Sequence, residues 1–215
     1  MADTHKTLKI SVLGAGVMGL SCAYALWRDG HDVTLYDPLG FPADNASFIA
    51  GGMLAPYSEL DHMPQDYLPA GLESIQIWSD IQKVCARDFE FSQNGSILIA
   101  HPEDRHLQER FKSILPANDQ NWEILDAQAL YALEPTLSKR GFKSGLYLKT
   151  EAKLAPRKAM EVLCDALPNK MIQSLNSEAA AQKADYVIDC RGMSDDTQRK
   201  DLRGVKGEVL LVQNP

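Results

Sequence analysis

The sequence lacks the paired motifs that hold metal ions or form disulfide networks. Its four cysteines lie far apart without a CxxC pair, and three of them fall in apolar runs typical of buried segments, so we expect free core thiols. The five histidines show no spacing typical of metal ligands. We therefore predict no metal site.

Long apolar runs and clusters of positive charge are also missing. No stretch approaches the length of a membrane span, and the N-terminal segment MADTHKTLK lacks the apolar centre of a secretory signal. A net charge of −7 and a pI near 5.2 argue against a nucleic-acid surface and against binding to anionic membranes. We expect a cytoplasmic protein with no nucleic-acid partner and no membrane span.

The most informative stretch of the chain is residues 8–37. Leu8–Leu13 is a short apolar run typical of a buried strand, and a GxGxxG motif follows where the periodicity changes to that of a helix. The helix is predicted from about Val17 to Asp29, and a second strand over Asp32–Tyr36 ends at Asp37. This order of strand, glycine-rich turn, helix and strand is typical of a dinucleotide-binding unit.

The glycines of the motif suit a diphosphate ligand. Gly14 permits the tight turn, Gly16 lets the backbone approach a pyrophosphate, and Gly19 lets the helix pack close to the strand. The first N–H groups of the helix, at Val17 and Met18, have no intrahelical partner and lie at the positive end of the helix dipole. The alternative interpretation is a crossover with a glycine-rich turn and no ligand.

The acidic residue that follows the second strand restricts the ligand further. The Asp37 carboxylate can accept hydrogen bonds from ribose hydroxyls and would repel a 2′-phosphate, which disfavours an NADP-type ligand. These residues alone do not separate NAD from FAD.

A second segment, ASFIAGGMLAPYSEL over Ala46–Leu60, is rich in small residues. Small side chains leave the backbone bare, as is needed where main-chain N–H groups contact a bulky planar ligand. A small-residue helix packed on a sheet would have the same composition, and composition leaves both interpretations open.

The GxGxxG motif, the acidic residue and ASFIAGGMLAP together resemble the flavin-dependent amine oxidases of the D-amino-acid oxidase family. They look most like its glycine oxidase branch, which is associated with thiamine synthesis, and LDAQALYALEP and EAKLAPRKAM resemble the family as well. The resemblance implies FAD as the cofactor and an α/β fold, in which a Rossmann-like FAD-binding domain is joined to a partial, mainly antiparallel α+β substrate domain. It implies an FAD-binding domain over 1–80 and 150–200, and a partial substrate domain over 81–149 and 201–215.

The resemblance also implies which residues hold the cofactor. The Ala-Ser and Ala-Gly-Gly-Met positions would line the FAD pyrophosphate and flavin, with Met53 near both flavin and substrate, and Gly192 would approach the cofactor after a strand over Asp185–Asp189. Arg191 departs from the family pattern, which has a small residue there. The expected cofactor-binding residues are Gly14, Gly16, Val17, Met18, Gly19, Asp37, Ala46, Ser47, Ala50, Gly51, Gly52, Met53 and Gly192.

The activity implied by the resemblance is oxidative deamination of a small amino acid or amine. Glycine, sarcosine or a D-amino acid would become an imine or oxo acid, with O₂ as oxidant and peroxide as product, in a step linked to thiamine thiazole synthesis. We name no catalytic residue, because the arginine that holds the substrate carboxylate in the family lies in a later part of the family pattern. The alternatives are an FAD- or NAD-binding module without turnover, one half of a split oxidase, or a remnant that no longer holds cofactor.

The last residues of the sequence are expected to form an apolar strand over Val205–Val212. Such a strand would lie at an edge of an incomplete sheet, and unpaired edges favour association. We therefore predict self-association or a partner chain that supplies the rest of the substrate domain.

Overall fold

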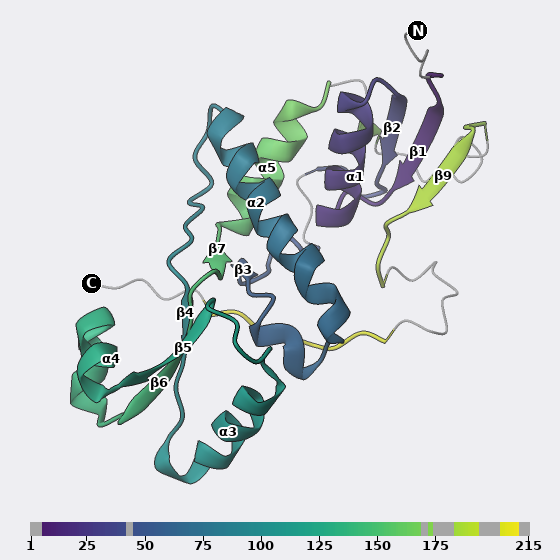
Figure 1. Cartoon of the computed structure of the whole chain (residues 1–215). Coiled ribbons are helices and arrows are strands. Elements are labelled where there is room, and N and C mark those ends of the chain that lie inside the picture. Colours follow the sequence, from purple (N-terminus) through teal and green to yellow (C-terminus); the bar gives the residue numbers. More distant parts are fainter. Residues whose placement is uncertain (1–5, 42–44, 169–171, 174–182, 194–202, 211–215) are drawn as a thin grey trace, which may run out of the picture. The chain divides into compact units, whose positions relative to one another are not determined.

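The computed structural model describes residues 6–41, 45–168, 172–173, 183–193 and 203–210 (Figure 1). The chain forms two compact units, Met1–Gly51 with Ala155–Pro215 and the continuous segment Gly52–Leu154. The first unit is therefore built from two separate parts of the sequence. These boundaries differ from the predicted domain ranges, and the roles attached to those ranges stay predictions.

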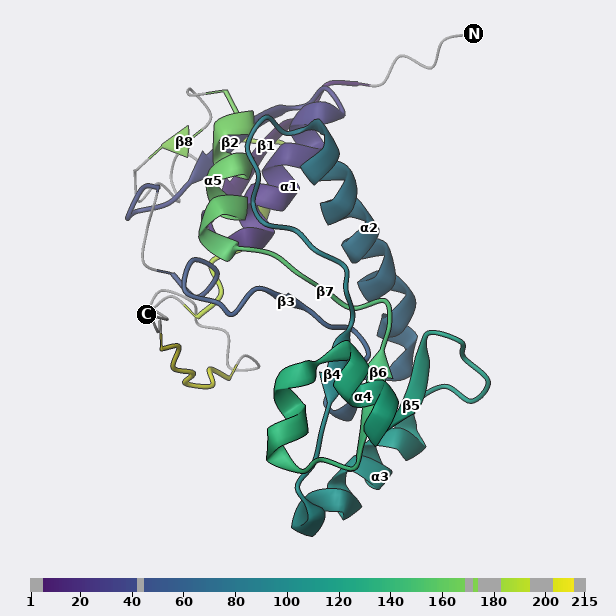
Figure 2. The ribbon, with the colours of Figure 1, turned by 90° about the vertical axis from the view of Figure 1, so that its left-hand side faces the viewer.

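The first unit contains a parallel sheet with helices packed on it. Figure 2 shows its two helices, which contact each other. The strands follow one another across the sheet as β8 (Ile172–Gln173), β2 (Asp32–Tyr36), β1 (Lys9–Leu13) and β9 (Tyr186–Asp189), and the helices are α1 (Val17–Arg28) and α5 (Pro156–Ala166). All described strand pairs of this sheet are parallel, as expected for a Rossmann-like domain.

The sequence of β1 explains its central position. Four of its five residues are buried, which is typical of a strand covered on both faces of a parallel sheet. Leu20 and Ala23 of α1 are fully buried, so the helix covers the sheet with its apolar face. Gly30 follows α1 at a φ of +87°, and its N–H group donates to the carbonyl of Trp27. This glycine ends the helix in the way that the sequence predicts.

The second unit is built on antiparallel strands. Its main sheet has the order β4–β6–β5, and β3 pairs with β7 in a separate two-stranded ladder. The strands are β3 (Met53–Leu54), β4 (Ser96–Leu98), β5 (Trp122–Asp126), β6 (Ser144–Leu148) and β7 (Ala152–Lys153). The α-helices are α2 (Leu68–Val84), α3 (Arg105–Ile114) and α4 (Ala127–Leu133), with 3-10 turns over Ser58–Asp61, Gln65–Tyr67, Pro102–Asp104 and Pro135–Arg140. The predicted α/β class, with an antiparallel α+β part, is confirmed.

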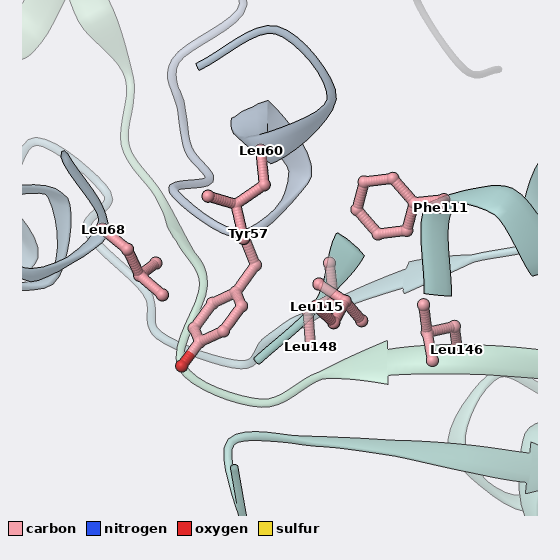
Figure 3. Packing of buried hydrophobic residues seen from close by; sticks show 7 residues of the cluster. All are labelled: Tyr57, Leu60, Leu68, Phe111, Leu115, Leu146 and Leu148. Atoms are coloured by element: carbon pink, nitrogen blue, oxygen red, sulfur yellow. The ribbon is translucent and has the colours of Figure 1, made fainter. Parts of the chain in front are cut away.

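A compact apolar cluster holds the second unit together. It joins the turn after β3, the start of α2, the end of α3 and the buried face of β6, as Figure 3 shows. Leu148 and Tyr57 are fully buried in it. The cluster comprises Tyr57, Leu60, Leu68, Phe111, Leu115, Leu146 and Leu148.

The Tyr57 hydroxyl gives this unit a predicted pH dependence. It donates to Asp119 and accepts from the Asn121 Nδ2 at 3.1 Å, and burial first, then the bond to Asp119, raises its pKa from about 10 to about 12. The folded unit thus binds this proton more tightly than the unfolded chain, so the stabilisation is complete below pH ~10 and is lost as the pH rises toward ~12. Urea unfolding across this range should show stability falling more steeply for the wild type than for Tyr57→Phe. If the unfolding free energy of both proteins falls equally with pH, the stabilising role of the Tyr57 proton is contradicted.

The predicted strand Val205–Val212 is wrong over residues 205–210. These residues form neither helix nor strand, and Leu211 and Val212 lie outside the described residues. Val205 and Leu210 are each 87% exposed. An apolar run of this kind forms a strand only where a neighbouring strand accepts its hydrogen bonds, and the run alone does not specify that neighbour.

Candidate functional site

The turn after β1 is closed by contacts that only glycine permits. Gly14 has a φ of +96°, and its N–H group donates to the carbonyl of Tyr36 at 2.7 Å. A Cβ atom added at Gly14 would lie 2.7 Å from the carbonyl oxygen of Cys190. The backbone that follows β9 therefore fills the space that a side chain at this position would need.

The other two glycines of the motif have different surroundings. A Cβ atom at Gly19 would lie 1.7 Å from the Gly14 carbonyl oxygen, so Gly19 is required for α1 to pack against the turn. A Cβ atom at Gly16 would meet only the Ser47 hydroxyl, at 3.3 Å. Packing within the unit thus explains Gly14 and Gly19, whereas Gly16 keeps the start of the helix open.

The N-terminus of α1 has no side-chain cap from its own N-cap residue, Gly16. Instead the Val17 N–H group donates to the Ser47 Oγ at 2.9 Å, and the Met18 side chain is 64% exposed. The helix start therefore combines backbone N–H groups, the positive end of the dipole and a hydroxyl. This donor set suits a phosphate. The sequence placed Ser47 near the cofactor but gave no signal for its bond to Val17.

The Asp37 carboxylate lies beside this turn. Its Oδ2 accepts from the Ala15 N–H group at 2.7 Å, and its Oδ1 accepts from the Leu39 N–H group at 2.9 Å. Two backbone donors therefore fix the carboxylate at the carboxyl end of β2. Each carboxylate oxygen can accept more than one hydrogen bond, so hydroxyl groups of a ribose can still bind there.

The residues after β9 close the other side of the turn. The Cys190 N–H group donates to the Leu13 carbonyl at 2.8 Å, and burial, followed by the neighbouring Cys22 thiol, raises the pKa of Cys190 to about 11. The Arg191 side chain donates to Asp189 from Nε to Oδ1 at 3.0 Å and from Nη2 to Oδ2 at 2.9 Å, and its backbone N–H group donates to Oδ1 at 3.1 Å. Gly192 has a φ of +62°, and a Cβ atom there would meet nothing within 4 Å. The unusual arginine is thus held by an acid on its own segment.

Residues 46–52 of the small-residue segment form turns and irregular backbone rather than a helix, and β3 follows them. The part that belongs to the first unit borders a groove of about 990 Å³, together with the start of α5 and residues 205–210. Three predicted cofactor residues, Ala46, Ala50 and Gly51, line this groove, and a Cβ atom at Gly51 would meet nothing within 4 Å. The alternative of a packed small-residue helix is therefore wrong.

The predicted site residues divide between the two units. The glycine motif, Asp37 and Ser47 are brought together in the first unit by the hydrogen bonds described above. Gly52 and Met53 belong to the second unit, where Gly52 has a φ of +77° and Met53, in β3, is 66% exposed. Their place at a flavin stays a prediction.

Two further observations limit what the described residues hold. No described helix has the length and apolarity needed to cross a bilayer. Within the same residues, no three His, Cys, Asp or Glu side chains lie close enough together to bind a metal ion.

The parallel sheet and the glycine turn at the carboxyl end of β1 are typical of domains that bind a dinucleotide cofactor. The turn at Gly14, the open helix start at Val17 and the fixed Asp37 carboxylate fit the ADP part of such a cofactor. The chain belongs to the FAD-dependent oxidoreductase family DAO, whose sequence model matches residues 9–215. FAD, predicted from the sequence, is the cofactor of this family.

One curated relative matches almost the whole of this chain. Over 208 residues the chain is 33% identical to the "putative thiamine biosynthesis oxidoreductase ThiO" of Rhizobium etli, covering 96% of this chain and 61% of that protein. The chain thus spans less than two thirds of this curated relative's length.

Solved structures show the same fold. Glycine oxidase from Geobacillus kaustophilus matches with a TM-score of 0.65 at 18% identity, covering 78% of this chain and 46% of that one. Glycine oxidase from Bacillus cereus matches with a TM-score of 0.60 at 17% identity, covering 85% of this chain and 47% of that one. The FAD-bound L-α-glycerophosphate oxidase of Mycoplasma pneumoniae matches with a TM-score of 0.61 at 20% identity. This match covers 79% of this chain and 44% of that one.

Proposed function

We propose that this chain binds FAD through its first unit and takes part in the oxidation of a small amino acid or amine. The observation that carries the proposal is the joint placement of the open α1 start, the Ser47 hydroxyl and the Asp37 carboxylate around one glycine turn. This arrangement offers donors to a diphosphate and acceptors to a ribose. The likeness to ThiO supports a link to thiamine synthesis, and the likeness to two glycine oxidases supports the amine substrate.

Each residue would have a separate task in holding the cofactor. The Met18 N–H group and the Ser47 hydroxyl would bind the diphosphate, and the Val17 N–H group, which donates to the Ser47 Oγ, would hold that hydroxyl in place beside it. Asp37 would accept from the ribose, and Gly52 and Met53 would lie toward the flavin and substrate. Ala46, Ala50, Gly51 and Gly192 would leave the backbone bare for close approach.

The chemistry of the bound flavin is the transfer of two electrons from the substrate to an acceptor. An amine such as glycine, sarcosine or a D-amino acid loses a hydride and a proton and becomes an imine. Water would then hydrolyse the imine to an oxo acid and release ammonia or, from sarcosine, methylamine. O₂ would take up the two electrons and two protons as hydrogen peroxide. The protein would orient the substrate Cα–H bond and exclude competing reactions. A cytoplasmic location is part of the same proposal.

An FAD-binding module without turnover is the second candidate. It is favoured by the contacts described above, which suit the ADP part of the cofactor and assign no described residue to the chemical step. A related alternative is one half of a split oxidase, which would bind a partner chain. The exposed Val205 and Leu210 side chains favour such association or self-association.

A visible absorbance spectrum after gel filtration tests both candidates. We expect the two flavin bands to co-elute with the protein, at an elution volume that indicates a mass greater than that of one chain. Anaerobic bleaching of the bands by glycine or sarcosine, but not by glycerol 3-phosphate, would support the oxidase. Bands that persist with every amine would support the binding module. A protein that stays colourless after incubation with FAD would contradict the proposed function.

A further inference from the structure

A carboxyl group lies fully inside the second unit. Glu151 is 0% exposed and directly precedes β7. Its Oε1 accepts from the Ser58 N–H group at 2.7 Å, and its Oε2 accepts from the Ser58 Oγ at 3.0 Å. Burying a carboxyl group is unfavourable unless its oxygens are hydrogen-bonded, so Glu151 depends on Ser58.

The contact between Glu151 and Ser58 closes one end of a short segment that runs from Gly52 to Ser58. The other end is held by the Leu154 N–H group, which donates to the Gly52 carbonyl at 2.9 Å. Between these ends, Met53 pairs with Lys153 in the antiparallel β3–β7 ladder. Three contacts thus connect the segment to the chain around β7: the bonds of Ser58 to Glu151, the bond of Leu154 to Gly52 and the β3–β7 ladder. The Met53 side chain is nevertheless 66% exposed.

The surroundings of Glu151 contain further polar groups. The hydroxyls of Ser92 and Thr150 are buried without a hydrogen-bond partner in the described part of the chain. Thr150 precedes Glu151, and Ser92 exchanges two backbone hydrogen bonds of 2.9 Å with Lys153. An unpaired buried hydroxyl is unfavourable, and a bound water or a functional role can account for it. The chain around β7 thus contains one hydrogen-bonded carboxylate and two further buried hydroxyls.

We propose that Glu151 is a positioning residue, which acts through Ser58 to fix the Gly52–Leu54 segment and thereby the place of Met53 at the flavin and substrate. The inference rests on the proposed function, since that function places Met53 there. Glu151 itself would contact neither cofactor nor substrate. Its two acceptor oxygens hold the backbone and the hydroxyl of one residue, which restricts both the position and the rotation of the segment.

Amide hydrogen exchange measured by mass spectrometry tests the holding role without any cofactor. Peptides over residues 52–58 should exchange roughly tenfold faster in Glu151→Gln and in Ser58→Ala, because each variant weakens one part of the contact. Glu123→Gln is the matched control, since this carboxylate of the same unit is 48% exposed and pairs with Lys149 at 3.1 Å. The control should leave exchange over 52–58 unchanged.

The FAD-loaded protein tests the consequence for the cofactor. Glu151→Gln should leave the FAD dissociation constant within about twofold of wild type, because the residues proposed to hold the ADP part lie in the first unit. The visible circular dichroism of the bound flavin should change, and its reduction by the amine should slow by ~10–100-fold, as expected for misplacement near a reacting centre. A variant that merely loosens the fold would instead weaken FAD binding and these signals together.

Unchanged exchange over residues 52–58 in both Glu151→Gln and Ser58→Ala would overturn the inference. The inference would also be overturned if amide exchange over residues 52–58 became faster in Glu151→Gln while the circular dichroism of the flavin and its reduction rate stayed unchanged. If the wild type binds FAD but no amine reduces it, the oxidase proposal fails, while exchange and dichroism still decide the role of Glu151. If the wild type binds no FAD, the proposed function fails and the positioning role at the flavin falls with it.

Discussion

Gly19→Ala is expected to abolish both the native packing of the first unit and FAD binding. The added methyl group would lie 1.7 Å from the Gly14 carbonyl oxygen, which is backbone and cannot rotate away. Either α1 moves off β1 or the turn opens, at an expected cost of about 3 kcal/mol or more in unfolding free energy. Both movements would displace the Val17 N–H group from the Ser47 hydroxyl. Thermal unfolding and FAD titration by fluorescence quenching measure the two effects.

Gly51→Ala serves as the matched control for the fold. A methyl group there meets nothing within 4 Å, and Gly51 has no positive φ, so the unfolding free energy should stay within about 0.5 kcal/mol of wild type. A Gly19→Ala protein that unfolds at the wild-type temperature and binds FAD with wild-type affinity would refute the close packing of helix and turn.

Asp37→Ala is expected to weaken FAD binding by ~10–100-fold. The carboxylate holds the Ala15 and Leu39 N–H groups, and hydrogen bonds to a charged group contribute about 1.5–3 kcal/mol each. Its loss would loosen the turn and remove the acceptor proposed for the ribose. Isothermal titration with FAD measures the change. Asp32→Ala, at the opposite end of the same strand, should bind FAD as the wild type does.

Asp37→Asn separates charge from hydrogen bonding at this position. Asparagine keeps one acceptor oxygen but replaces the other with a donor, so one of the two backbone bonds should remain. We expect intermediate FAD affinity, together with weaker discrimination against nucleotides that carry a 2′-phosphate. If Asp37→Ala and Asp32→Ala weaken FAD binding equally, the assignment of Asp37 to the cofactor is wrong.

Local sequence signals were sufficient for the elements around the glycine turn. The helix predicted from Val17 to Asp29 is α1, Val17–Arg28, and the strand predicted over Asp32–Tyr36 has those bounds in β2. Asp126, a residue type that favours helix N-termini, caps α4 by accepting from the Ala129 N–H group at 2.8 Å. In each case the residues that define the element are neighbours in the sequence, so periodicity and capping determine it.

Features that depend on distant parts of the chain were not predictable in this way. The β3–β7 ladder joins Met53 to Lys153, and each strand is too short for a recognisable alternation. The bond from Val17 to Ser47 needs a turn that brings a loop residue to a helix start. No local pattern in the sequence marks Glu151 as buried. Only the position of Ser58 in space explains its burial.

The split construction of the first unit has a consequence for synthesis on the ribosome. Strand β1 pairs with β9 through Ile10 and Tyr186, whereas the second unit is the unbroken segment Gly52–Leu154. All of the second unit is therefore translated before β9 exists, and during this interval one edge of β1 has no neighbouring strand. Uncovered edges of nascent sheets attract other chains, so the yield of native protein should depend on how quickly translation proceeds from residue 155 to Asp189.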